Sequence, residues 1–233
     1  MLRSFVGLAF GLTLAAGYSV AADTKISKAD ADKAKKALRE VQDFMGGWNL
    51  EGTQKAGGRT EAWKEKVDWA WKFKTDEPTI RVTFAEGKGK HFSKGELKYA
   101  VAKKKYVLAL VGADKSEQVF EGTLVNGSLK MQRKDAKSGD VYRLTMNTLA
   151  DGVRFSFKLE RQEGGRGLFA NAFLMNGNKE GESLAGGSKK PECIVTGGAA
   201  SIAVSYQGKT YYVCCTGCRD AFNESPEKFL KKK

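Results

Sequence analysis

The residues best suited to chemistry in this chain are its four cysteines, which all lie between positions 193 and 218. Cys214, Cys215 and Cys218 are nearly consecutive, and Cys193 precedes them at a distance that a hairpin can fold back. Thiolates bind soft metal ions such as Cu(I) and Zn(II), whereas cysteines in an oxidising compartment usually pair into disulfides. The pattern therefore indicates either a soft-metal site or a disulfide clamp.

The secondary structure expected around the cysteines would bring three of them together. Residues 202–206 and 210–214 have the composition of two strands with a turn between them, and a helix is expected to follow directly. Cys214, at the end of a strand, and Cys218, in the first helical turn, can then face one point. The hairpin returns the tight turn that carries Cys193 to the same place. We expect these three sulfurs to converge, with the helix N-terminus favouring the thiolate form.

The fourth cysteine, Cys215, has three possible roles. Because side chains alternate along a strand, it faces away from Cys214 and is expected to be a buried core thiol. A fourth metal ligand and a disulfide partner for Cys218 remain as alternatives. The spacing from Cys215 to Cys218 is that of a redox motif, but the surrounding sequence lacks the βαβ pattern in which such motifs occur.

The C-terminal segment resembles the YHS family, within the TRASH-type metal-binding modules. The resemblance is carried by Cys193-Ile194-Val195-Thr196-Gly197, by the run from Tyr206 to Cys218, and by Ser225-Pro226-Glu227-Lys228-Phe229. It implies a small treble-clef-like hairpin–helix module in which Cys193, Cys214 and Cys218 bind a metal ion. Such modules accompany metal transporters and metal sensors. The chain departs from the family at Ile194, where a proline often follows the first cysteine.

A pattern with a period of two runs through most of residues 48–175 and predicts antiparallel strands. Asn126-Gly127 and Asp151-Gly152 are strong hairpin signals, because both central residues of a type I′ turn need positive φ. About eight to ten short strands joined in sequence form an up-and-down meander, and its closure into a barrel removes exposed edges. The strands are expected at residues 48–53, 62–74, 79–85, 96–102, 106–111, 118–125, 128–133, 141–147, 153–161 and 168–175.

Gly46-Gly47-Trp48, at the entry to the first expected strand, resembles the G-x-W motif of lipocalins. The meander is likewise similar to the lipocalin or calycin barrel. The resemblance implies that an arginine, Arg154 or Arg161, packs over the tryptophan. The chain departs from lipocalins in having a long helix before the barrel.

That helix is expected over residues 27–45, with Ser27 as its N-cap and Gly46-Gly47 at its end. Apolar residues recur at spacings of three and four along it, which is typical of one buried helix face. We expect this face to pack on the barrel. The apolar residues are Ala31, Ala34, Leu38, Val41 and Met45.

The N-terminus has the pattern of a secretory signal peptide at residues 1–22. A single Arg3 precedes an uncharged apolar run, Phe5 to Val20, and small residues end at Ala22. The run is short against the roughly 20 residues that span a bilayer, so a membrane anchor is disfavoured. The chain is therefore divided into a signal peptide (1–22), a helix plus lipocalin-like barrel (23–179), a Gly/Ser linker (180–190) and the YHS-like module (191–233).

Other features narrow the function. The formal net charge is +13, but the lysines are dispersed rather than gathered with aromatic residues, so nucleic-acid binding is not expected. The single histidine, His91, lies in a Gly/Lys-rich turn and is expected at the surface. Nucleotide-binding and hydrolase motifs are absent from the sequence. Trp63, Trp69 and Trp71 share a strand face and are expected to fill the barrel core, with a ligand cavity as the alternative.

The leading hypothesis is a periplasmic or secreted, non-enzymatic metal-binding protein without stable membrane insertion. Its module would hold Zn or Cu(I) through Cys193, Cys214 and Cys218, with Cys215 as a further candidate, for sequestration or delivery. A metal transporter or another envelope protein is the expected partner. The alternative is a carrier of a small apolar ligand in the barrel, with the cysteine module as a structural cap held by disulfides or zinc.

Overall fold

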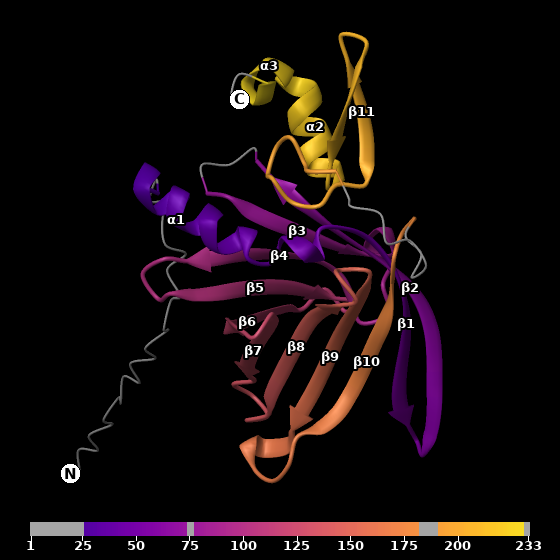
Figure 1. The fold of residues 1–233 in the computed structure, drawn as a ribbon. Coiled ribbons are helices and arrows are strands. Elements are labelled where there is room, and N and C mark those ends of the chain that lie inside the picture. The colour runs from indigo at the N-terminus through magenta and orange to yellow at the C-terminus, as the bar shows by residue number, and fades with distance from the viewer. Residues whose placement is uncertain (1–25, 74–76, 182–190, 231–233) are drawn as a thin grey trace, which may run out of the picture.

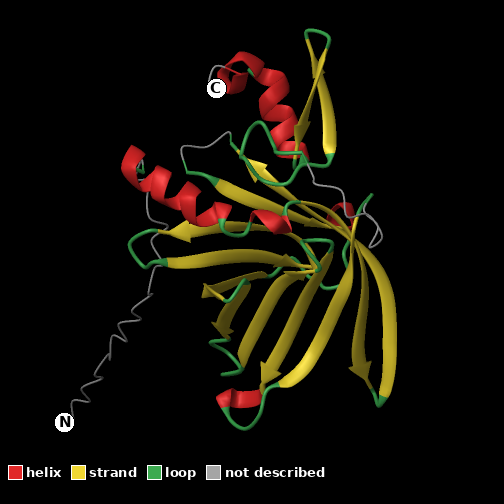
Figure 2. Ribbon diagram, in the orientation of Figure 1, coloured by secondary structure: helices red, strands yellow, loops and turns green. Residues whose placement is uncertain are grey.

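The computed structural model describes residues 26–73, 77–181 and 191–230. Figure 1 and Figure 2 show a strand barrel with a helix lying across one end and a small helix–hairpin module beside that end. The expected signal peptide and residues 182–190 of the expected linker lie outside the described residues. Within the part of the chain that the structure describes, no helix is long and apolar enough to cross a membrane.

Ten antiparallel strands form a closed barrel, which confirms the expected up-and-down architecture. Each strand pairs with its neighbours in the sequence, and β1 pairs with β10 to close the ring. Two of the connections contain short 3₁₀ turns, η2 (Ala85–Gly87) and η3 (Glu163–Gly165). The strands are β1 (Gly46–Ala56), β2 (Arg59–Lys72), β3 (Thr79–Phe84), β4 (Phe92–Ala100), β5 (Lys105–Gly112), β6 (Glu117–Val125), β7 (Ser128–Lys134), β8 (Val141–Leu149), β9 (Arg154–Gln162) and β10 (Ala170–Lys179).

The first hairpin is longer than the sequence pattern indicated. β1 and β2 pair continuously from Gly46 opposite Trp69 to Ala56 opposite Arg59. The two glycines between them have positive φ, which a tight two-residue turn requires. The same rule holds at Asn126-Gly127, where φ is 49° and 72°. The hairpin signal read from this dipeptide is confirmed.

The helix expected over residues 27–45 is shorter than predicted. Helix α1 (Lys28–Arg39) has Ser27 as its N-cap, with the side chain accepting from the Asp30 N–H. The chain then turns through the 3₁₀ segment η1 (Gln42–Phe44), because Phe44 leaves the helical face to enter the barrel end. The expected apolar face is nevertheless buried at Ala34, Leu38, Val41 and Met45.

Aromatic side chains fill the barrel interior. Trp48 and Trp69 are fully buried, and Phe44 packs edge-on against Trp69 (5.8 Å) and Phe155 (5.2 Å) between ring centroids. Farther along, Phe157 contacts Phe84, Phe92 and Phe173 at 5.9–6.2 Å. These contacts join opposite walls of the barrel, so side chains occupy this part of its interior.

The cation over Trp48 differs from both candidates named from the sequence. The Trp48 indole N–H donates to the Phe44 carbonyl (2.8 Å), and the Lys179 ammonium lies 5.1 Å from the Trp48 ring centroid. Arg161 instead pairs with Asp140 at 2.8 Å, and Arg154 is exposed. A lysine at the end of the last strand thus takes the place that the lipocalin resemblance gave to an arginine.

The C-terminal module consists of a hairpin, β11 (Ile202–Tyr206) and β12 (Lys209–Val213), followed by helices α2 (Thr216–Glu224) and α3 (Pro226–Leu230). Phe222 of α2 is fully buried and packs against Tyr206 and Tyr211 of the hairpin. The hairpin–helix order expected from the sequence is confirmed.

Candidate metal centre

Cys193 lies in a tight turn that is tied to the hairpin. Its N–H donates to the Gly198 carbonyl (2.7 Å), and its carbonyl accepts from the Gly197 N–H (2.8 Å). Gly197 has a φ of 80°, a left-handed conformation that glycine adopts readily. The Ile194 N–H donates to the Tyr212 carbonyl in β12 (3.0 Å). A proline at 194 has no N–H, so the residue that departs from the family pattern supplies the bond that holds this turn beside the hairpin.

The other cysteines lie where β12 ends and α2 begins. Cys214 follows the strand directly, and Cys215 is in extended conformation (φ −159°) at the N-cap position of α2. Cys218 lies in the first turn of α2. The Arg219 N–H donates to the Cys215 carbonyl (3.0 Å), which closes that turn. The strand-to-helix junction therefore presents Cys214 and Cys218 on one side, as the spacing predicted.

The sulfurs of Cys193, Cys214 and Cys218 all lie within 4.8 Å of one another. The Cys214 and Cys218 sulfurs are 3.6 Å apart, and all three residues are at most 3% exposed. An ion about 2.3 Å from each sulfur would hold them roughly 4 Å apart, so only small adjustments are needed to bind one. Together, the three thiols form a buried cluster suited to a metal ion.

Hydrogen bonds inside the cluster shift the pKa of Cys193 in one direction and the pKa values of Cys214 and Cys218 in the other. The Cys214 and Cys218 thiols lower the pKa of Cys193 by hydrogen-bonding its sulfur. The same interaction with Cys193 raises the pKa of Cys214 and of Cys218, and burial raises both further. Thr196 also contacts the Cys214 sulfur through its hydroxyl (3.5 Å). An ion that binds all three sulfurs must therefore displace protons held by Cys214 and Cys218.

Cys215 is fully buried but is not part of the three-sulfur group. Its sulfur hydrogen-bonds with the sulfurs of Cys214 and Cys218, which lower its pKa, and it also accepts from the backbone N–H groups of Trp71, in the barrel, and of Cys218, in α2. Burial and the neighbouring Cys215 raise the pKa of the Asp68 carboxyl, which lies on the same barrel strand as Trp71. Cys215 is buried at the junction with the barrel, but its sulfur does not face away from Cys214 as strand alternation predicted. All four cysteines are free thiols.

His91 lies only partly at the surface, which corrects part of the sequence-based expectation. It is half-buried, stacks on Phe173 (4.3 Å between centroids) and meets the edge of Trp63 (5.2 Å). Its Nε2 is buried without a hydrogen-bond partner, and burial lowers its pKa. The Gly/Lys-rich neighbours gave no sign of this, because Phe173, its stacking partner, comes from a distant strand.

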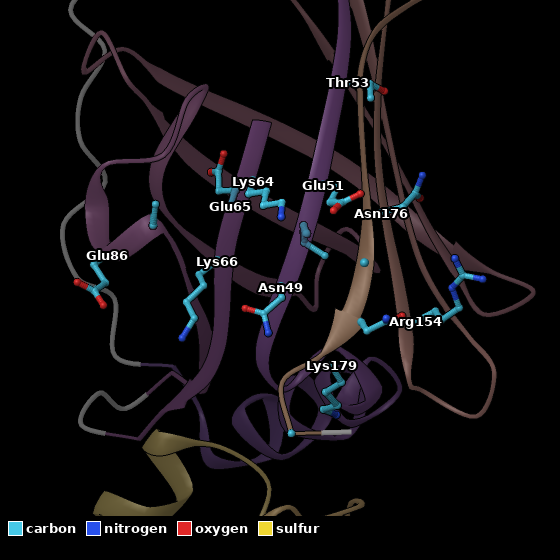
Figure 3. A pocket seen from close by; sticks show the side chains of 15 residues that line it. Asn49, Glu51, Thr53, Lys64, Glu65, Lys66, Glu86, Arg154, Asn176 and Lys179 are labelled. Carbon is cyan, nitrogen blue, oxygen red and sulfur yellow. The ribbon is translucent and has the colours of Figure 1, made fainter. Parts of the chain in front are cut away.

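A groove of about 1320 Å³ lies on the outer surface of the barrel (Figure 3). Asn49, Glu51 and Thr53 of β1 line it, and they alternate with the buried residues that face the interior. Lys64 and Lys66 of β2 border it. Charged side chains of both signs therefore line the groove, and it is distinct from an apolar cavity inside the barrel.

With this geometry in place, comparison with known families identifies the module. Residues 195–233 match the model of the YHS domain. The C-terminal part of the chain is therefore a YHS domain, as its cysteine pattern indicated. Cys193 lies two residues before the matched segment, and its clustering with Cys214 and Cys218 of the YHS domain suggests a metal-binding module.

Beyond the YHS domain, the comparisons are less specific. No curated protein matches the chain. Among solved structures, the crystal structure of Rv2717c from M. tuberculosis is similar, at 16% sequence identity and a TM-score of 0.45. The similarity covers 62% of this chain and 97% of that one.

Proposed function

We propose that this protein binds one soft metal ion through Cys193, Cys214 and Cys218, for sequestration or delivery and without catalysis. The observation that carries the proposal is the convergence of three buried sulfurs within 4.8 Å of one another. Buried thiols seldom gather in this way for packing alone, whereas thiolate clusters are the preferred ligands of soft ions. The YHS match over residues 195–233 supports the same function.

The ligand set favours Cu(I) over Zn(II). Structural zinc is almost always held by four ligands in a tetrahedron. Among the described residues, the group that could hold an ion supplies three sulfurs, and its members are all thiols. Three thiolates with no oxygen or nitrogen ligand suit Cu(I), a soft ion. Zinc would need a fourth ligand from solvent or from a partner.

The burial of the cluster favours storage or controlled transfer. Its three cysteines are between 0% and 3% exposed, so an ion exchanges only when the module opens locally. We place this activity in the periplasm or outside the cell, on the basis of the signal-peptide pattern at residues 1–22. A metal transporter or another envelope protein would be the source or recipient of the ion.

The alternative of an apolar-ligand carrier has less support. The interior contains aromatic contacts between walls, such as Phe84 with Phe157 (6.0 Å), where such a ligand would lie. The groove in Figure 3 is on the outside and lined by polar side chains. Both observations favour metal binding by the module as the primary function.

The decisive experiment measures bound metal and free thiols together on mature protein purified from the exported compartment. A variant with Cys193, Cys214 and Cys218 all replaced by Ser is the comparison, and Ser205→Ala, on the exposed face of β11, is the matched control. About one equivalent of copper that is lost only in the triple variant supports the proposal. Metal-free protein with its cysteines oxidised in pairs would overturn it in favour of the disulfide clamp.

A further inference from the structure

The YHS module sits on a free edge of the barrel. The register between β1 and β2 ends at Gly46 opposite Trp69, but β2 continues to Lys72. On its other side, this extension pairs with β3, where Trp71 lies opposite Ile80. A strand edge without a neighbour presents backbone N–H and C=O groups that need partners. In Figure 1 the start of α2 lies at this end of the barrel.

Two residues of the strand-to-helix junction meet this edge at Trp71. The Trp71 N–H donates to the Cys215 sulfur. A Cβ atom on Gly217 would lie 1.9 Å from the Trp71 carbonyl oxygen, so the first turn of α2 rests directly on the strand backbone. Only glycine allows so close an approach. Cys215 therefore contacts the N–H of Trp71 at this edge, and Gly217 contacts the C=O of the same residue.

The same junction carries two of the three candidate ligands. Cys215 directly follows Cys214, and Gly217 directly precedes Cys218. Fixing the two anchors on the barrel therefore fixes the backbone between the two ligands. The buried residues of the barrel and of the module also form one continuous apolar cluster. Among the described residues, the barrel contributes no cysteine to the site, but it holds the segment that positions two of the sulfurs.

We propose that the free edge of β2 at Trp71 is a docking seat that preorganises the metal site, with Cys215 and Gly217 as positioning residues rather than ligands. The inference rests on the proposed function, since it concerns the same ion. Docking that holds Cys214 and Cys218 in place lowers the cost of binding. By reciprocity, an ion that binds the docked arrangement more tightly strengthens docking to the same degree.

The test compares Cu(I) affinity and the exchange of the Trp71 amide hydrogen in the full-length protein. Cys215→Ala removes the acceptor, Cys215→Ser restores one, and Gly217→Ala forces α2 away from the strand. Asn223→Ala, exposed on the same helix, is the matched control. Chelator competition gives the affinity, and circular dichroism verifies that each variant retains its strands.

We expect Cys215→Ala and Gly217→Ala to bind one ion about 10- to 100-fold more weakly, the usual cost of losing a group that orients metal ligands. Their Trp71 amides should exchange faster, whereas Cu(I) should slow this exchange in the wild type. Cys215→Ser should recover part of the affinity, and Asn223→Ala should match the wild type.

Three outcomes count against the proposal in different ways. Wild-type affinity in both Cys215→Ala and Gly217→Ala, with the ion still bound, would overturn the docking seat and leave the proposed function intact. Complete loss of the ion in Cys215→Ala and Cys215→Ser alike would show that Cys215 is a ligand. A wild-type protein that takes up no Cu(I) would overturn the proposed function and the coupling with it.

Discussion

The YHS module and the barrel are both organised around buried side chains, but the two sets of buried groups differ in kind. In the module, Cys193, Cys214 and Cys218 are buried with reactive sulfurs turned toward one another. In the barrel, residues such as Phe157 and Trp69 are buried with apolar surfaces in contact. Packing of apolar surfaces accounts for the second set. It does not explain the first, so the difference locates the chemistry in the module.

The most direct way to break this comparison is to remove one thiol. Cys193→Ser should weaken ion binding on the order of a thousandfold, if about 10–16 kcal/mol of binding is shared among three thiolates. The barrel should keep its unfolding midpoint in the metal-free protein, because Cys193 lies outside the ten barrel strands and Ser is close to Cys in size. Competition with a chelator and denaturant unfolding measure the two effects. Retained affinity would remove Cys193 from the ligand set.

The corresponding test in the barrel is to truncate one side chain of its core. Phe157→Ala should destabilise the fold by about 3–5 kcal/mol, because it leaves a cavity among several aromatic neighbours. Ion stoichiometry should stay at one under conditions where the variant is folded. Leu149→Ala is the matched control, since Leu149 is 58% exposed and should cost less than about 0.5 kcal/mol. Loss of the ion from folded Phe157→Ala would show that chemistry and packing are not separated as proposed.

The two regions also differ in how well the sequence predicted them. The cysteine cluster was predictable because Cys214 and Cys218 are close in sequence, so local strand and helix geometry almost determines their relation. The barrel was predictable as a class from its alternating pattern and its turns. His91 was not, since its burial depends on Phe173, more than half the barrel away along the chain. The contact of Cys215 with Trp71 likewise depends on how the module packs against the barrel.

The length of α1 was misjudged for a related reason. The apolar spacing runs from Ala31 to Met45, and every member of it except the half-buried Ala31 is buried. Helical periodicity alone cannot show that the chain leaves the helix after Arg39 to insert Phe44 into the barrel end. Burial was therefore predicted correctly where secondary structure was not, because the barrel, rather than local propensity, determines where the helix ends.

Lowering the pH should also distinguish the metal site from the barrel, with a smaller effect than Cys193→Ser or Phe157→Ala. Because Cys214 and Cys218 hold protons that the ion must displace, lowering the pH from about 8 to about 7 should weaken binding roughly tenfold for each proton released. Affinity thus falls as pH falls, and isothermal titration in buffers of different ionisation enthalpy counts the protons. A pH-independent affinity would mean that the sulfurs are not the ligands.

The barrel should respond over a different range of pH. Burial lowers the pKa of His91 below its usual value of about 6.5. A histidine held neutral in the folded state lowers stability only where the unfolded chain takes up its proton. The contribution of His91 to the free energy of unfolding is therefore constant between about pH 7 and 8, and it becomes destabilising below about pH 6.5. Between about pH 7 and 8, only the affinity for the ion should change with pH. His91→Phe, which keeps the stacking on Phe173, should remove the destabilisation below pH 6.5 and leave the pH dependence of ion binding as it was, because the two titrations belong to separate sites.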